Sequence, residues 1–339
     1  MLSSHGPTRR LPCAQALLVA LGLWLIASAG RADNATPAPN STPQEELASP
    51  SGADGWTHPN DEAPDVLPKD VVRMDKPFGE PLPDDSDYSW QWAPTGLIYH
   101  SYMAGEHEPH MSMFLQNDTN GTTYGDATLG GRAGLVRYGN QDAMHPVGYQ
   151  LDFYGAAIAR LNVDHQEDLD ACDYVFGFPL TWGDEHWQWK CGYAHTSSHM
   201  GDEFAIRNPG QLNNRVNYVR DGIELGTSYY VNPAWRIYGE TGWCFNSSGG
   251  ADPWDVQFGT ELSHPGPTNC WTPFVAVNGR LREEQDFSGD FTLQCGWLQR
   301  GLLNQTLRLG AQYYNGKSNE FEFFTKNEQQ VGVGIWYDF

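Results

Sequence analysis

The last nine residues of the chain alternate between two kinds of side chain and end on an aromatic residue. Residues 331–339 read VGVGIWYDF, so that Val331, Val333, Ile335, Tyr337 and Phe339 share one face of a strand. In a soluble domain such a strand would leave an apolar edge with nothing after it to cover it. A closed transmembrane barrel has no free edge, and its strands alternate lipid-facing and lumen-facing residues. The pattern therefore predicts the closing strand of a β-barrel.

The same period of two recurs from Tyr88 onward in segments separated by turns. In 305–316, for example, Leu307 and Leu309 oppose Arg308, with apolar residues outward and polar residues inward. Working back from the C-terminus, the predicted strands are 328–339, 305–316, 289–299, 270–282, 254–263, 234–245, 215–231, 186–197, 172–183, 148–162, 127–138 and 108–116, with 89–103 as an extra candidate. Because bacterial single-chain barrels have even strand counts, we predict an all-β antiparallel outer-membrane β-barrel of about 12 strands, within a range of about 10 to 14.

Connection lengths predict how this barrel is oriented. Outer-membrane barrels have short periplasmic turns and longer extracellular loops. The predicted short connections are Asn232-Pro233, 183–185 and 300–304. The longer, polar or Gly-rich ones are 198–214, 244–253, 283–288 and 317–327. These lengths indicate a periplasmic C-terminus, although 264–269 and 139–147 are long for periplasmic turns.

The N-terminal region predicts export. Arg9 and Arg10 precede an apolar run over 16–27, and Ala27-Ser-Ala29 provides small residues for cleavage, with a second cleavage position after Ala32. We expect a signal peptide over 1–29. Residues 30–87 are rich in Pro and Asp, and such a composition buries too little apolar surface to fold, so we expect a disordered periplasmic segment there. The barrel would then occupy 88–339.

Composition narrows the partners. Forty-two acidic residues against twenty basic residues argue against nucleic-acid binding, which needs a basic surface. Thirteen Trp, sixteen Tyr and fifteen Phe fit aromatic girdles at two membrane interfaces. We therefore expect membrane lipids and lipopolysaccharide as partners, in the cell outer membrane. The cysteines beyond the signal peptide are widely spaced and describe no disulfide framework.

Charged residues fall on the predicted lumen face of several strands. We expect them to form an internal network of salt bridges and hydrogen bonds, and in a wider barrel the same residues could line an ion path. They are Arg132, Asp152, Arg160, Lys190, Glu224, Arg236, Glu240 and Glu261.

One polar cluster could carry chemistry. His195 and Ser197 lie two apart on the lipid-facing side of an outward-running strand, near its extracellular end. A Ser–His pair needs a third group to orient the imidazole, and Glu203 and Asn208 follow on the next loop.

This His-x-Ser strand resembles those of outer-membrane phospholipase A and lipid A 3-O-deacylase. The resemblance implies that His195 is the base, Ser197 the nucleophile, and an Asn or Glu farther along the third member. Glu203 is nearer in sequence, and Asn208 is closer to the spacing in those families. Both families have Asn directly after the Ser, where this chain has Ser198.

A wider resemblance is to the bacterial family called domain of unknown function 1207. It is carried by Ser101-Tyr-Met-Ala-Gly105 with Glu108-Pro109, by residues 195–204 (HTSSHMGDEF), and by Asn217-Tyr-Val-Arg-Asp221. This resemblance covers much of 89–339 and brings no established activity with it.

Two other interpretations of the cluster stay open. His199, Asp202, Asn217 and Arg220 complete a polar group that is also typical of an ordinary barrel rim. A metal site would need a folded loop, because His195 and His199 would be about 13 Å apart on a strand. We expect no metal and no cofactor, and nothing in the sequence supports a calcium requirement. The alternative to a serine-type lipid acyl hydrolase is a non-enzymatic barrel, either a narrow channel or a structural envelope protein.

The terminal strand generates one test. We expect the strand ending in Phe339 to be recognised by the outer-membrane insertion machinery. Deleting Phe339 should therefore lower the amount of protein recovered in the outer-membrane fraction, as measured by immunoblotting of separated membranes. Unchanged recovery would contradict this role of the terminal aromatic residue.

Overall fold

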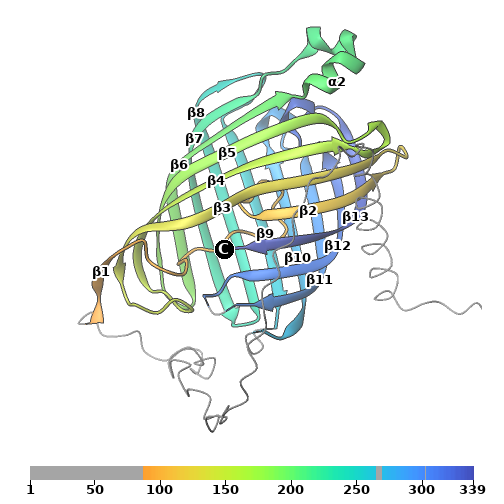
Figure 1. The fold of residues 1–339 in the computed structure, drawn as a ribbon. Helices are drawn as coiled ribbons and strands as arrows, with labels where there is room; N and C mark the ends of the chain where they lie inside the picture. Colours follow the sequence, from red (N-terminus) through yellow and green to blue (C-terminus); the bar gives the residue numbers. More distant parts are fainter. Residues whose placement is uncertain (1–86, 265–268, 302) are drawn as a thin grey trace, which may run out of the picture. The chain divides into compact units, whose positions relative to one another are not determined.

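The computed structural model describes residues 87–264, 269–301 and 303–339 (Figure 1). The predicted signal peptide over 1–29 lies outside the described residues, as does the predicted disordered segment apart from Asp87. No helix among the described residues is long and apolar enough to cross a membrane.

The described residues form one antiparallel sheet of 13 strands. Each strand from β2 to β13 pairs with its neighbours in sequence, and β13 pairs back onto β2, which closes a ring of 12 strands. The predicted β-barrel and its strand number are therefore confirmed. The strands are β1 Ser89–Trp92, β2 Met111–Asp118, β3 Thr123–Gly139, β4 Gly148–Asn162, β5 Asp168–Gly183, β6 Trp187–Met200, β7 Val219–Asn232, β8 Trp235–Ser248, β9 Trp254–Ser263, β10 Trp271–Arg282, β11 Gly289–Arg300, β12 Thr306–Lys317 and β13 Asn327–Asp338.

Short helical elements lie in the connections. They are η2 Val163–His165, α2 Asp202–Arg207, η3 Pro209–Asn214, η4 Glu283–Gln285 and η5 Phe321–Phe323. All five follow the end of β4, β6, β10 or β12, so they gather at one end of the barrel, which we call the loop end. The opposite, turn end carries the tight connections after β5 and β7.

The closing strand has the predicted faces. Val331 is 58% exposed and Trp336 only 3%, which places the apolar set outside and Trp336 inside. Ile335 pairs with Leu309 of β12 and with Met113 of β2, so the outward apolar surface continues across the seam of the barrel. A band of exposed apolar side chains on a closed sheet is the surface that a lipid-facing barrel presents.

The candidate strand over 89–103 is wrong beyond its first residues. Only β1 is extended; it pairs with the end of β3 outside the 12-strand ring, and it is visible at the lower left of Figure 1. Pro94 interrupts a strand because it has no N–H to donate. Gly96, with φ +77°, then turns the chain close to the carbonyl oxygen of Ala143, where no side chain would fit.

Residues 93–110, which we call the inner segment, pass through the lumen. Tyr102 is fully buried, donates a hydrogen bond to Glu240 at 2.8 Å and stacks on Tyr238 at 3.8 Å. The backbone N–H of Met103 donates to Glu261 at 2.7 Å, and its carbonyl accepts from Arg308 at 3.0 Å. The inner segment thus provides hydrogen-bond partners for charged residues of the lumen. Its own side chains occupy the place that a pore would take.

The predicted lumen charges form the expected internal network. Arg132 pairs with Asp152 at 2.7 Å, and Lys190 lies 2.6 Å from Glu240 and 3.5 Å from Glu224. The remaining predicted members are also engaged, through Arg160 with Asp126 at 2.9 Å and Arg236 with Glu261 at 3.3 Å. Buried charges are tolerated when they are paired and hydrogen-bonded, so this network allows a charged interior inside an apolar shell.

This filled lumen predicts low conductance. Purified protein in planar lipid bilayers should show little or no steady current, because the inner segment and the paired charges occupy the space that ions would need. Large, stable conductance steps would instead show that the inner segment leaves the lumen.

The network also predicts the cost of removing one charge. Lys190→Ala should destabilise the barrel by about 3–5 kcal/mol, because Glu224 and Glu240 would lose their buried cation. Urea unfolding in detergent micelles measures this loss. Arg215→Ala, at an exposed loop position, is the control and should change stability by less than about 0.5 kcal/mol.

Candidate functional site

The candidate site begins with two side chains on the outer face of β6. His195 pairs in register with Phe176 of β5, and Ser197 pairs with Tyr174. Phe176 and Tyr174 are both exposed on the outer face of the barrel. Because residues directly opposite each other point to the same side of a sheet, His195 and Ser197 also lie on this outer, apolar face. They lie toward the loop end, as β6 runs from Trp187 to Met200.

A carboxylate on the next strand holds the His195 ring. Asp221 of β7 is the register partner of His195, and its Oδ1 lies 2.7 Å from His195 Nδ1. Tyr193 donates its hydroxyl to the same oxygen at 2.6 Å, and Asn246 donates its amide to Oδ2 at 2.8 Å. Three polar groups therefore converge on one carboxylate at the outer surface.

A β-bulge brings Asn246 into this group. Between β7 and β8 the register shifts, with Asp221 opposite Asn246 and Gly222 opposite Cys244. The extra residue, Phe245, is exposed on the outer face. A bulge redirects the side chains next to it, and here it places an amide donor beside the carboxylate.

The polar group has an aromatic border. The Phe176 ring lies 4.7 Å from the His195 ring, and 6.0 Å from that of Tyr193. On the other side, the ring of Phe245 lies 6.5 Å from that of Tyr193. The border places apolar surface directly beside the imidazole.

The arrangement can perform acid–base chemistry. A protonated Nδ1 donates to Asp221 and leaves Nε2 as the acceptor. Ser197 lies two residues farther along the same face, so its hydroxyl is the nucleophile nearest in sequence on that face. Among the described residues, no hydrogen bond joins His195 to Ser197; the imidazole is bonded to Asp221.

The structure places the two predicted third members away from the imidazole. Asn208 follows α2, where its side chain donates to the carbonyl of Phe204 at 3.0 Å. Glu203 is exposed in the first turn of α2. Neither residue hydrogen bonds with His195; Asp221 takes that place. The strand register is the reason: a partner on an adjacent antiparallel strand is near in space but 26 residues away in the chain. Asp221 ends the motif 217–221 of the family resemblance, which is the sequence signal that could have pointed to it.

The other predicted polar residues separate to the two sides of the barrel wall. His199 is exposed outside, with its ring 5.8 Å from that of Tyr174. Asp202 is exposed at the start of α2. Arg220 points inward and donates to the carbonyls of Asp252 and Pro253. Asn217 has φ +54° and donates its backbone N–H to Glu322. The predicted single cluster is therefore divided. His199 and Arg220 lie on opposite faces of the sheet, as alternation along a strand allows, and Asp202 and Asn217 lie in the connection between β6 and β7.

Comparison with known families assigns the chain. Residues 90–339 match the model of the family described as "Protein of unknown function (DUF1207)". The chain belongs to this family. No curated protein matches the sequence.

Solved structures similar to this DUF1207 member include outer-membrane phospholipases and a porin. The outer membrane phospholipase A from Escherichia coli is 13% identical, with a TM-score of 0.45 over 68% of this chain and 91% of that chain. The Salmonella typhi outer membrane phospholipase, solved as a dimer with bound calcium, is 10% identical, with a TM-score of 0.45 over 68% and 92%. A triple mutant of the Rhodopseudomonas blastica porin is 8% identical, with a TM-score of 0.29 over 68% and 98%.

The His, Cys, Asp and Glu side chains of this DUF1207 member bear on metal binding. Within 87–264, 269–301 and 303–339, no set of three His, Cys, Asp or Glu side chains is arranged to hold a metal ion. The five cysteines of this part of the chain, Cys172, Cys191, Cys244, Cys270 and Cys295, are free.

Proposed function

We propose that this barrel hydrolyses acyl esters of membrane lipids at the outer leaflet of the outer membrane. Ser197 is the nucleophile, His195 the general base and acid, and Asp221 the group that orients the imidazole. In this proposal the loop end faces the outside of the cell, and the chain reaches the membrane through a cleaved signal peptide.

The observation that carries the proposal is the hydrogen bond between His195 and Asp221 on the lipid-facing side, with Ser197 two residues along the same face. A nucleophile, a base and a third group that orients the base make up the recurring arrangement of serine hydrolases. Tyr193 and Asn246 support it, because they hold the carboxylate in position for the ring.

The reaction follows from these positions. Ser197 Oγ attacks the ester carbonyl while His195 Nε2 takes the hydroxyl proton. His195 then returns this proton to the leaving alcohol, and the acyl group stays on Ser197. A water molecule, deprotonated by His195, releases the fatty acid and restores the hydroxyl. Asp221 stabilises the imidazolium that forms in each step.

The location of the site suits a lipid substrate. A phospholipid or lipopolysaccharide molecule in the outer leaflet already lies against the exposed surface of Phe176 and Phe245. Its ester group therefore need not leave the membrane to approach Ser197. An active site in the lumen would be separated from lipids by the barrel wall.

A structural envelope barrel is the second candidate function. The filled lumen favours it over a channel, since Tyr102 and Lys190 are buried among paired charges where ions would pass. Under this alternative the His195 group is part of a polar rim facing headgroups and water.

The hydrolase is tested by fatty-acid release from phospholipid and from lipid A in mixed micelles. Ser197→Ala should abolish release, and His195→Ala should cost about as much because the members of a catalytic unit are not additive. Asp221→Ala should lower the rate by roughly 10²–10⁴-fold, because His195 then loses the carboxylate that orients it as the general base.

The matched control is Ser198→Ala. It makes the same chemical change one residue along, on the inner face of the same strand, and should retain release. Heat-modifiable gel mobility confirms that each variant is folded. Folded wild-type protein that releases no fatty acid, or Ser197→Ala protein that still does, would contradict the hydrolase and leave the structural barrel.

A further inference from the structure

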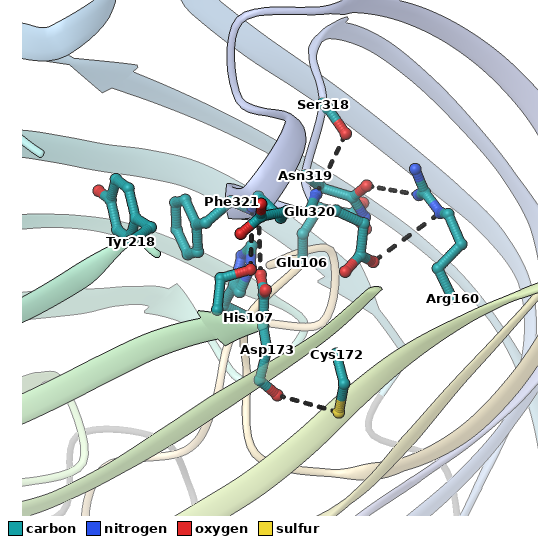
Figure 2. A network of polar contacts seen from close by, with 12 residues as sticks. Glu106, His107, Arg160, Cys172, Asp173, Tyr218, Ser318, Asn319, Glu320 and Phe321 are labelled. Carbon is teal, nitrogen blue, oxygen red and sulfur yellow. Dashed lines mark hydrogen bonds and ion pairs between the residues drawn. The ribbon is translucent and has the colours of Figure 1, made fainter. Parts of the chain in front are cut away.

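The connection between β12 and β13, residues 318–326, folds into the mouth of the barrel at the loop end. We call it the cap. Its residue Phe321 is buried, with its ring 4.3 Å from that of His107 and 4.5 Å from that of Tyr218 (Figure 2). The backbone N–H of Phe321 donates to Asp173 at 3.1 Å. The cap is therefore held by the inner segment and by strand β5.

Glu322 ties the cap to the neighbouring strands. Its backbone N–H donates to the hydroxyl of Ser198 at 2.9 Å. Its carboxylate accepts the backbone N–H groups of Val216 and Asn217, at 2.9 and 3.3 Å. Each oxygen of this buried carboxylate therefore has a hydrogen-bond donor.

The carboxylate of Glu320 has no such hydrogen-bond donors. Its side chain is fully buried and neither carboxylate oxygen has a hydrogen-bond partner. The nearest cation is Arg160, whose Nε lies 3.8 Å away. Figure 2 shows Glu320 and Asn319 of the cap turned toward this guanidinium.

Arg160 cannot satisfy Glu320 as well as its other partners. Its Nε and Nη2 donate to Asp126, and its Nη1 donates to Glu328 at 2.9 Å. Nη2 also donates to the side-chain oxygen of Asn319 at 2.6 Å. One positive charge therefore faces three carboxylates, and the two on β3 and β13 take the ion-pair hydrogen bonds.

The other titratable groups around Glu320 come from β5, the inner segment and the cap itself. Asp173 of β5 faces it, already bonded to His107 and to the cap backbone. Glu106 of the inner segment accepts hydrogen bonds from Thr292, Gln312 and Asn319. The Cys172 thiol on β5 lies nearby. Lys326, at the far end of the cap, is a second cation and is repelled by Arg160.

A carboxylate that is buried without donors and faces like charge is stable only in its neutral form. Glu320 lies in the connection between two strands, and burial, together with the charge on Asp173, raises its pKa. A neutral carboxyl group also removes the repulsion from Asp126, Asp173 and Glu328. The folded-in cap is consequently a proton-bound state.

We propose that residues 318–326 are a proton-operated cap, which stays in the mouth while Glu320 is protonated and swings out when Glu320 gives its proton to water. Outside the barrel the carboxylate is hydrated and no longer faces Asp173. The released cap exposes Phe321 and opens the mouth of the lumen to solvent.

The sign of the pH dependence follows from proton binding. The closed state holds one proton that the open state releases above the ordinary Glu pKa. Closure is therefore most favourable below that ordinary value, and it is lost as the pH rises through the raised pKa of the closed state.

Hydroxyl-radical footprinting with mass spectrometry measures this opening on full-length protein in lipid vesicles. Between about pH 5 and about pH 10, oxidation of Phe321 and Phe323 should rise with pH in the wild type. Phe287, which is 48% exposed on another loop, is the internal control and should be oxidised at every pH. Glu320→Gln removes the titrating group and should keep Phe321 protected throughout.

The matched control is Glu322→Gln, a change of the same kind two residues along the cap. It weakens the contacts to Val216 and Asn217, so it should raise Phe321 oxidation overall while keeping its dependence on pH. Oxidation of wild-type Phe321 that does not change with pH would overturn the proposal, as would an unchanged pH dependence in Glu320→Gln. Opening that follows sodium or calcium concentration at constant pH would show that a cation, not a proton, neutralises Glu320. The wild-type titration decides the matter if Glu320→Gln does not fold.

Discussion

The pairing of β2 with β13 is the constraint on which the rest of the structure depends. Inside a bilayer no water is available for unpaired backbone groups, so a sheet must close on itself to be stable there. Closure gives every strand of the ring from β2 to β13 two neighbours and two faces of opposite polarity. It also determines which residues lie opposite each other, and so brings Asp221 to His195 although many residues separate them in the chain.

Alternation along the strands, with its period of two, determines which features of the structure could be predicted from the sequence. The faces of the closing strand and the inward direction of Arg132 and Lys190 depend only on alternation, which a sequence displays directly. The role of Asp221 depends on the register between β6 and β7, which no local pattern encodes. The predicted strand over 89–103 is wrong beyond Trp92, because the chain turns into the lumen there. Leu97, Ile98 and Tyr99 are buried inside the barrel, where the Arg236 guanidinium lies 5.2 Å from the centre of the Tyr99 ring.

The barrel wall is a single β-sheet, so neighbouring side chains of β6 face different surroundings. Ser197 faces the lipid side, while Ser198 accepts a hydrogen bond from the cap inside the lumen. The proposed ester chemistry and the proposed cap therefore share a strand without sharing a side chain. Any coupling between them would pass through Val216 and Asn217, which donate to Glu322 and lie just before the strand that carries Asp221.

The position of the inner segment has a consequence for assembly. It precedes β2 in the chain, yet its hydrogen bonds reach β8, β9, β11 and β12. These contacts can form only when β8 to β12 are in place, although the inner segment precedes all of these strands in the chain. The strands that complete the barrel therefore also complete the set of partners inside its lumen.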